Sequence, residues 1–261
     1  MPTLQSNTQQ NLDNTQYAVE SIEHYELIFG RDFVSPGGEA LSLQLIERMQ
    51  LSPDNLVLDM GCGLGGSAFL MARKLGLQVE GIDLSENMIR QAVERCHEYA
   101  LNDRVKFYQG NCLGIEKTDR YDAIYSRDVF LHIENKAQLF DVIYRVIKPG
   151  GQLLFSDYCC GNRPWQDSFS HYVSQRGYHL CTVERYRDLL LKAGFSVTQA
   201  IDETELFLHT LREELKKIVN LSLPEATRFE LSNSWKAKIS RAEAGDHRWG
   251  VFSAIKTTTN M

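Results

Sequence analysis

Residues 55–75 carry the feature that most constrains the fold, a short apolar run followed by a glycine-rich turn and a helical pattern. The run NLVLDM, from Asn55 to Met60, has the length and composition of a buried strand. Glycines follow directly at positions 61, 63, 65 and 66, and we predict a helix from there to about Leu75. Glycine permits a sharp turn and a close approach of backbone to a ligand. The segment therefore predicts a strand–turn–helix unit with a ligand at the carboxyl end of the strand.

The same alternation of strands and helices continues along the chain. We predict strands at 79–84, 105–109, 123–126, 152–157 and 195–201, and helices at 85–100, 136–147 and 183–193. An irregular stretch is expected after Asp157. Because alternating strands and helices form a parallel sheet covered on both faces, the pattern predicts an α/β fold with a doubly wound, mostly parallel sheet.

The two ends of the chain add helices to this core. Apolar residues recur at helical spacing over 17–29, and a second helix is predicted at 39–49. Near the other end, 203–220 is amphipathic and 249–255 is predicted to be the last strand. We divide the expected single domain into a flexible tail (1–14), an N-terminal helical lid (15–50), a ligand-binding core (51–201) and cap helices with a last strand (202–261).

Composition disfavours several classes of protein. With 28 Lys and Arg against 34 Asp and Glu, the net charge is −6, which argues against nucleic acid as the main partner. No apolar run reaches the roughly 18 residues of a membrane-spanning helix, so we expect no membrane insertion. The polar N-terminal residues lack the pattern of a secretory signal. The six scattered cysteines contain no Cys-x-x-Cys pair, so we expect free thiols in the cytoplasm and no metal site.

The glycine-rich turn by itself fits two kinds of cofactor. Gly61, Gly63 and Gly66 satisfy the pattern G-x-G-x-x-G, and Asp83 ends the second strand, as a nicotinamide dinucleotide site requires. Asp59 precedes the first glycine by two residues, where a carboxylate could face a cationic ligand but would repel a pyrophosphate. The turn therefore leaves a nicotinamide-dependent oxidoreductase open as an alternative.

An ordered set of further motifs favours a methyltransferase. Lys-Pro-Gly-Gly at 148–151 follows a helix and precedes a strand, and Tyr-Asp-Ala-Ile at 121–124 leads into another strand. Together with VLDMGCGLGG at 57–66, these motifs resemble the class I S-adenosylmethionine-dependent methyltransferases. The resemblance covers 55–201 and implies their Rossmann-like fold and S-adenosyl-L-methionine as cofactor.

Stretches outside this core resemble one narrower family, the phosphoethanolamine (phosphobase) N-methyltransferases. They are NTQY (14–17), HYELIFGRDFVSPGG (24–38), YSRDVFLHI (125–133), SDYC (156–159), YVSQRGY (172–178) and WKAKI (235–239). The resemblance implies an enzyme that converts phosphoethanolamine stepwise to phosphocholine. It also implies a monomer whose partner is a small phosphobase substrate.

The resemblance assigns roles to individual residues. It implies a catalytic dyad of Tyr17 and His132. The substrate would be bound by Asp128 beside the amine and by a phosphate clamp of Tyr158, Tyr172, Arg176, Tyr178 and Lys238. The cofactor would contact Gln16, Tyr25, Val34, Ser35, Gly61, Asp83, Leu84, Asn111, Cys112 and Arg127, to which the glycine-rich turn adds Asp59 and Gly63.

These residue types suit that chemistry. A phosphomonoester carries close to two negative charges at neutral pH, and Arg176 offers a planar fork for it while Lys238 offers a point charge. Asp128 can attract the amine, and tyrosine faces suit a methylated ammonium group. His132 belongs to a residue type that titrates near neutrality, so it could accept the proton that the amine loses.

Simpler structural roles remain open for some of these residues. Tyr17 could pack its helix, Tyr172 and Tyr178 could be core aromatics, and Lys238 could be a solvated helix charge. Asn111 stands where the family commonly has an acid, which predicts weaker cofactor binding. Pro36 stands where the family usually has a small polar residue. We assign no role to five histidines: His24, His171, His179, His209 and His247.

Two alternative functions keep the methyltransferase fold. One is N-methylation of another small amine, such as glycine, sarcosine or a natural-product amine, which would leave the cations at 176 and 238 without an anion. The other is cofactor binding without catalysis, which a complete dyad and clamp would disfavour.

Overall fold

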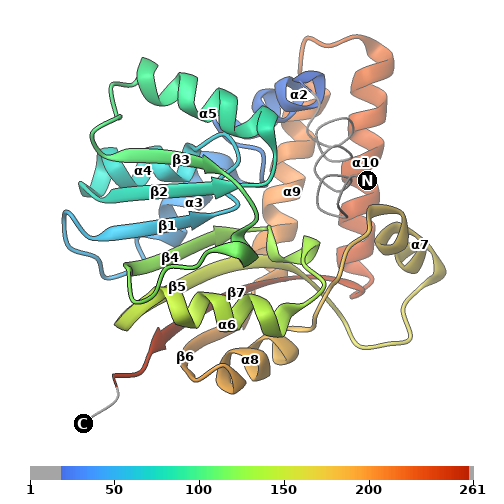
Figure 1. Ribbon diagram of the computed structural model, residues 1–261. Helices are drawn as coiled ribbons and strands as arrows, with labels where there is room; N and C mark the ends of the chain where they lie inside the picture. The colour runs from blue at the N-terminus through green and yellow to red at the C-terminus, as the bar shows by residue number, and fades with distance from the viewer. Residues whose placement is uncertain (1–18, 259–261) are drawn as a thin grey trace, which may run out of the picture.

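The computed structural model describes residues 19–258, and a seven-stranded sheet forms its centre (Figure 1). Its strands are β1 (Leu56–Met60), β2 (Gln78–Asp83), β3 (Val105–Gln109), β4 (Tyr121–Arg127), β5 (Ile147–Cys160), β6 (Phe195–Asp202) and β7 (His247–Lys256). The order across the sheet is β3-β2-β1-β4-β5-β7-β6. Strands β1 to β5 pair in parallel, and β7 pairs antiparallel with both β5 and β6. The predicted mostly parallel, doubly wound sheet is confirmed.

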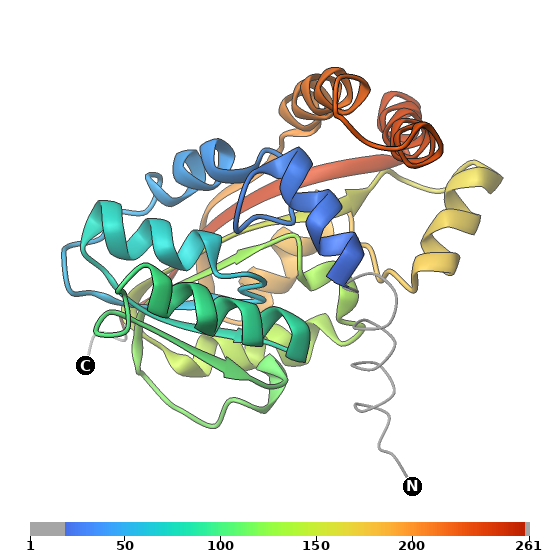
Figure 2. The ribbon, with the colours of Figure 1, turned by 90° about the horizontal axis from the view of Figure 1, so that it is seen from above.

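Helices cover both faces of the sheet. They are α2 (Val19–Phe29), α3 (Gly38–Ile46), α4 (Gly66–Leu75), α5 (Glu86–Glu98), α6 (Lys136–Val146), α7 (Asp167–Arg176), α8 (Val183–Lys192), α9 (Thr204–Val219) and α10 (Glu225–Glu243). Helices α3, α4, α9 and α10 share one buried apolar cluster, whereas α6 and α8 belong to the cluster on the opposite face. Figure 2 shows α9 and α10 running side by side.

Neighbouring residues of the strands divide between these two clusters. Val57 packs into the first cluster and Leu58 into the second, and Val251 and Phe252 divide in the same way. Successive side chains of a strand point to opposite faces of the sheet. A continuous apolar strand is therefore what a sheet covered on both faces requires.

The strand order creates a switch point beside β1. After β2 and β3 have been added on one side of β1, the chain returns and places β4 on its other side. The turns that follow these strands diverge there, which opens a crevice at the carboxyl ends of the strands. This crevice is where the predicted site residues should meet.

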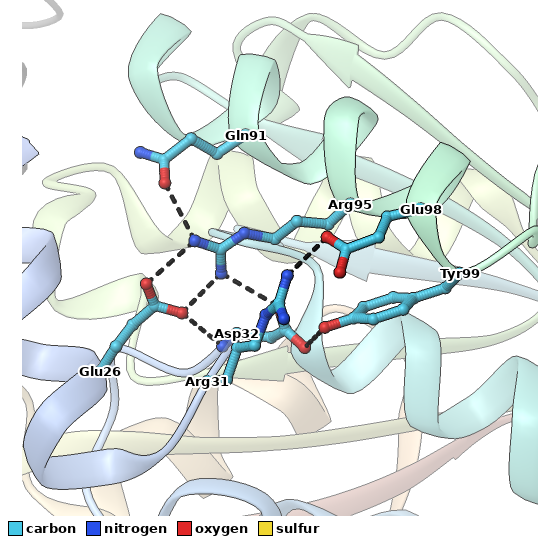
Figure 3. A network of polar contacts seen from close by, with 7 residues as sticks. All are labelled: Glu26, Arg31, Asp32, Gln91, Arg95, Glu98 and Tyr99. Carbon is cyan, nitrogen blue, oxygen red and sulfur yellow. Dashed lines mark hydrogen bonds and ion pairs between the residues drawn. The ribbon is translucent and has the colours of Figure 1, made fainter.

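Helix α2 is fastened to α5 by a polar network (Figure 3). Arg95 on α5 binds both carboxylate oxygens of Glu26 on α2, at 2.6 and 2.9 Å, and also donates to Asp32 Oδ1 at 3.0 Å. The Tyr99 hydroxyl donates to the other oxygen of Asp32 at 2.9 Å. Because the Arg95–Glu26 ion pair is bidentate and mostly buried, it holds α2 in a defined position against α5.

Most predicted elements are confirmed to within a few residues, but the stretch after Asp157 differs. It was expected to be irregular, yet β5 continues to Cys160 and α7 follows shortly afterwards. The strand continues because β7 pairs with it as far as Cys160 opposite His247. That partner is distant in sequence, so the local pattern did not contain the information.

Helix α10 was not given bounds in the sequence analysis, although cap helices were expected in that region. It buries Trp235, Ile239 and Ala242, which recur at spacings of four and three residues. Within residues 19–258, none of the helices combines the length and apolar character needed to cross a membrane.

Candidate functional site

A cavity of about 710 Å³ lies at the carboxyl ends of the parallel strands. Its walls come from the turns after β1, β2, β3 and β4 and from α2, α7 and α10. Within the described residues it brings together these predicted site residues: Tyr25, Val34, Ser35, Gly61, Gly63, Asp83, Leu84, Asn111, Cys112, Arg127, Asp128, His132, Tyr158, Tyr172, Arg176, Tyr178 and Lys238. Asp59 is not part of the lining. Gln16 and Tyr17 lie outside the described residues.

The glycine-rich turn forms one end of the cavity, and its shape depends on glycine. Gly61 has φ +78°, and a Cβ atom there would lie 2.3 Å from a methyl carbon of Val129. Its N–H donates to Ile82 O at 2.8 Å, which closes the turn against β2. Asp83 accepts hydrogen bonds from the backbone N–H of Gly63 and of Ser85, both at 2.9 Å. The carboxylate is thus held at the cavity wall by the turn that it faces.

Asp59 lies behind this turn in β1. It is 2% exposed, and its Oδ2 has no hydrogen-bond partner among the described residues. Burial, followed by repulsion from Asp83, raises its pKa to about 7, against an opposing effect of Arg127. Asp59 is therefore a buried carboxyl group behind the turn that borders the cavity, and it does not form part of the cavity wall.

Asn111 follows β3, at the position where the sequence departs from the family pattern. Its Oδ1 caps the short helix Cys112–Gly114 by accepting from the N–H of Leu113 at 2.9 Å. The side-chain oxygen is therefore already committed to the local backbone. This contact gives the amide a structural role in addition to its place in the cavity wall.

Arg127, at the end of β4, supports the loop between α2 and α3. The side chain is buried and donates to the carbonyl oxygens of Pro36 and Gly38, the latter at 2.9 Å. On the other side of this loop, the N–H of Gly37 donates to Glu214 Oε1 at 2.6 Å. The loop that carries Ser35 is therefore held from both the sheet and α9.

Asp128 follows directly with a left-handed backbone, φ +56°. Its Oδ1 accepts from Trp249 Nε1 at 2.8 Å and from Ser156 Oγ at 3.0 Å. Its Oδ2 is buried and has no partner among the described residues, and burial raises the pKa of the carboxyl group. A buried carboxylate oxygen without a donor is costly, so this atom is a natural place for a cationic group of a ligand.

His132 ends the short helix Phe130–His132. Its ring meets the Tyr178 ring edge-on, with 5.3 Å between the centroids. Burial, and then the positive charge of Lys136, lower its pKa to about 4. The imidazole is therefore neutral at pH 7 and does not titrate near neutrality as its residue type suggested. A neutral imidazole can accept a proton.

Lys136 ties the His132 loop to the segment that carries Tyr178. The ammonium group donates to the carbonyl oxygens of Ile133 and His179, the latter at 2.7 Å. The N–H of His179 also donates to Leu131 O at 2.8 Å. The two segments, far apart in the chain, are thus joined where they border the cavity.

Aromatic rings and cations form the opposite end of the cavity. The Tyr178 ring lies 5.7 Å from that of Tyr172 and 6.5 Å from that of Tyr158. Lys238 donates to the Tyr158 hydroxyl at 3.4 Å, and burial lowers its pKa to about 8. Arg176 stands exposed at the rim, at the end of α7. The alternative in which Lys238 is a solvated helix charge is wrong.

Other residues at this end were missed by the sequence analysis. Trp235 and Arg241 on α10 and Phe29 on α2 also line the cavity. Trp235 donates from Nε1 to Glu214 Oε2 at 2.9 Å, and its ring packs 5.8 Å from that of Phe29. The stretch WKAKI drew attention to this helix, but only a helical pattern through 243 would have placed Arg241 beside Lys238.

Two further groups have structural rather than ligand-holding surroundings. His247 is buried among the rings of Tyr158, Tyr172, Phe169 and Phe207, and neither ring nitrogen has a hydrogen-bond partner among the described residues. All six cysteines are free thiols. Within residues 19–258, no three His, Cys, Asp or Glu side chains are grouped so as to hold a metal ion.

Comparison with known proteins gives consistent matches. Residues 51–220 match the model of a methyltransferase domain family. Phosphoethanolamine N-methyltransferase 1 of Zea mays is 42% identical to this chain over 94% of the chain and 50% of the relative. Phosphoethanolamine N-methyltransferase of Plasmodium falciparum is 35% identical over 94% of the chain and 95% of the relative. The chain spans about half the length of the plant relatives that it matches.

Solved structures agree with these matches. Phosphoethanolamine N-methyltransferase 2 of Haemonchus contortus, in complex with phosphomonomethylethanolamine and S-adenosylhomocysteine, superposes with a TM-score of 0.91 at 34% identity. The match covers 96% of this chain and 60% of that one. A putative sarcosine dimethylglycine methyltransferase of Galdieria sulphuraria, at 22% identity and a TM-score of 0.75, shares the fold. The predicted class I methyltransferase fold is confirmed.

Proposed function

The chain belongs to the phosphoethanolamine N-methyltransferase family, and from that premise we propose that it methylates phosphoethanolamine stepwise to phosphocholine, with S-adenosylmethionine as the methyl donor. The observation that carries the proposal is the polarity of the cavity. An unpaired carboxylate oxygen of Asp128 and a neutral His132 lie between the glycine-rich turn and a cluster of cations and phenols. The match to a methyltransferase domain disfavours the nicotinamide-dependent oxidoreductase.

The cofactor would occupy the end built from the turns after β1, β2 and β3. There it supplies an electrophilic methyl group on a sulfonium. Asp83, fixed by two backbone donors, suits the hydroxyls of a ribose. Gly61 and Gly63 leave room for the cofactor because neither carries a side chain. The buried Asp59 and the unpaired Oδ2 of Asp128 place negative charge near a cation.

The phosphate of the substrate would lie at the opposite end. Arg176 can donate two parallel hydrogen bonds to phosphate oxygens, and Lys238 supplies a charge beside the Tyr158 hydroxyl. Burial lowers the pKa of Lys238 to about 8. A phosphate dianion beside it would favour the ammonium form, so the substrate strengthens the charge that binds it.

Anchoring the phosphate leaves the amine near Asp128 and His132. The substrate amine must lose a proton before its lone pair can attack the methyl group. The neutral imidazole of His132 can accept that proton, and the Asp128 carboxylate stabilises the ammonium group before transfer and the methylated cation after it. Most of the rate enhancement should come from holding the nitrogen in line with the methyl group. The proposed partner Tyr17 lies outside the described residues.

The direct test is methyl transfer from labelled S-adenosylmethionine to phosphoethanolamine and to its mono- and dimethyl derivatives. Product masses, with each substrate supplied separately, would show which steps occur. Transfer to none of the three would refute the proposal, and cofactor binding without turnover would support the non-catalytic alternative. Sarcosine and ethanolamine serve as comparison substrates, since neither carries the phosphate that the cations at 176 and 238 would bind.

Replacing His132 tests the proposed chemistry. We expect His132→Ala to lower kcat by about 10²–10⁴-fold, the usual contribution of a general base, with little change in cofactor affinity. His209→Ala is the matched control, because His209 is exposed on α9 and does not line the cavity. Equal kcat values for His132→Ala and the unchanged enzyme would remove His132 from the mechanism.

We also propose that the enzyme acts in the cytoplasm. The free thiols of all six cysteines support a reducing compartment.

A further inference from the structure

Helix α10 presents two cations to the cavity. Lys238 and Arg241 both line it, and they are three residues apart in the helix. Residues at that spacing lie on the same face of a helix. Arg241 therefore extends the positively charged wall beyond Lys238, although neither motif nor resemblance singled it out.

The surroundings of Arg241 leave its charge without an anion. Its guanidinium lies over the Tyr172 ring, 3.9 Å from the centroid. Its Nε is buried and has no hydrogen-bond partner among the described residues. No described carboxylate lies within ion-pair distance of it. Burial lowers the pKa of the group, as expected for a cation that is not compensated.

The nearby carboxylates are engaged elsewhere. Both oxygens of Glu214 accept hydrogen bonds, one from Gly37 and one from Trp235. Asp128 is anchored by Trp249 and Ser156, and its remaining oxygen lies at the proposed amine position. Among the described residues, the end of the cavity that holds Arg241 therefore has three cationic side chains and no carboxylate that forms an ion pair with Arg241.

A phosphomonoester has the charge and the acceptors that this end lacks. It carries close to two negative charges and three terminal oxygens. Arg176 reaches the site from α7, while Lys238 and Arg241 reach it from α10. The Arg241 guanidinium lies 3.9 Å from the centroid of the Tyr172 ring, and its buried Nε has no partner among the described residues, so this N–H is available to a phosphate oxygen.

We propose that Arg241 is a third cationic phosphate-binding residue, which donates hydrogen bonds to the substrate phosphate from α10 while the ring of Tyr172 packs against its guanidinium. This inference rests on the proposed function, which it deepens by adding a specificity-determining residue. The residue favours phosphorylated over unphosphorylated amines, because it contributes nothing to binding a substrate that lacks the anion.

The test compares Arg241→Met with Lys236→Met, which removes the same charge from an exposed position of α10 outside the cavity. Binding of inorganic phosphate to the full chain loaded with S-adenosylhomocysteine is measured by calorimetry, and KM is measured for phosphoethanolamine. We expect Arg241→Met to raise both constants about tenfold or more, as loss of a charged hydrogen bond does. Cofactor affinity should stay within twofold, and Lys236→Met should match the unchanged protein.

A conservative variant separates phosphate binding from support of Tyr172. Arg241→Lys keeps the charge and loses the planar fork, so we expect phosphate binding between that of the unchanged protein and that of Arg241→Met. If Arg241→Met does not fold, Arg241→Gln takes its place, with the melting temperature as the check. Phosphate affinity and KM within twofold of the unchanged protein in these variants would overturn the inference.

The two levels of the proposal fail in different ways. If the unchanged protein methylates phosphoethanolamine and the Arg241 variants do so with the same KM, the inference alone is refuted. If the unchanged protein binds inorganic phosphate through Arg241 but methylates no phosphobase, the proposed function is refuted and the anion-binding role is upheld.

Discussion

The two ends of the cavity are built in different ways. The proposed cofactor end is made of backbone turns at the ends of adjacent parallel strands, where Gly61 and Gly63 follow β1 and Asp83 ends β2. The proposed substrate end is made of side chains such as Tyr172 and Arg241, which come from helices outside the sheet. The first end depends on local conformation and the second on how distant segments pack. Substitutions at the two ends should therefore impair ligand binding in different ways.

The largest effect is expected from Gly61→Ala at the cofactor end. The added methyl group would need a left-handed backbone and would lie 2.3 Å from Val129. Backbone strain and overpacking together cost about 2–5 kcal/mol. We expect the affinity for S-adenosylmethionine, measured by calorimetry, to fall by at least about thirtyfold. Inorganic phosphate binding at the other end should change by less than twofold.

Gly76→Ala is the matched control for this change. Gly76 has a similar positive φ of +67°, but the nearest atom to an added Cβ, Pro53 Cβ, lies at 3.6 Å. This variant carries the backbone strain without the clash, at the end of α4 and outside the cavity. Cofactor binding should be preserved. A Gly61→Ala protein that binds the cofactor normally would show that the turn is more pliable than its geometry indicates.

This contrast explains which parts of the site could be predicted from sequence. At the cofactor end, glycines at this spacing after a buried strand determine the conformation of the turn. The positions of Gly61, Gly63 and Asp83 in the cavity could therefore be predicted from the local sequence. Asp59 was the exception. Its position two residues before Gly61 predicted a carboxylate that faces a cationic ligand, but its side chain is buried behind the turn and does not line the wall.

At the substrate end, local rules were not enough. Lys238 was located only through resemblance, and Trp235 and Arg241 were missed, because their place in the cavity depends on α10 packing against α9. The low pKa of His132 was also not predictable from residue type. The low pKa results from burial of the imidazole and from the nearby charge of Lys136. The ammonium group of Lys136 is held in place by hydrogen bonds to the carbonyl oxygens of Ile133 and His179, which belong to two segments far apart in the chain.

Glu214 connects the loop at 35–38 with Trp235 at the proposed substrate end of the cavity, and its replacement should have an intermediate effect. One carboxylate oxygen accepts from Gly37 and the other from Trp235. In Glu214→Gln only one side-chain oxygen remains, so one buried donor loses its acceptor, at a cost of about 1–3 kcal/mol. We expect denaturant unfolding to show this loss of stability, and KM for both cofactor and substrate to rise.

The neighbouring Glu213 provides the control. It is exposed and forms an ion pair with Lys216, one turn away on the same helix. Glu213→Gln should leave the unfolding free energy and both KM values nearly unchanged. If Glu214→Gln behaved in the same way, the loop at 35–38 and Trp235 would be held in place by apolar packing, and the two ends of the cavity would be independent of each other.

The smallest effect concerns pH and again separates the two ends. Burial, and then Asp83, raise the pKa of Asp59 to about 7, whereas burial and Lys136 lower the pKa of His132 to about 4. Between about pH 4 and 7 the folded protein therefore holds a proton on Asp59 that the unfolded chain has released. The contribution of Asp59 to stability should fall as pH rises through this range, and the difference in unfolding free energy between the unchanged protein and Asp59→Asn isolates it from the opposite contribution of His132. His132 stays neutral over the upper part of that range.

Cofactor binding should show the opposite dependence. A bound cation favours the Asp59 carboxylate, so binding releases a proton below pH 7 and affinity rises with pH. Between pH 6 and 7.5 we expect the affinity for S-adenosylmethionine to increase several-fold, up to about tenfold. Asp59→Asn should flatten this dependence, and Asp188→Asn, exposed on α8, should not. A dependence that persists in Asp59→Asn would place the titrating group elsewhere, so that the charge behind the glycine-rich turn would play no part in recognising the cofactor.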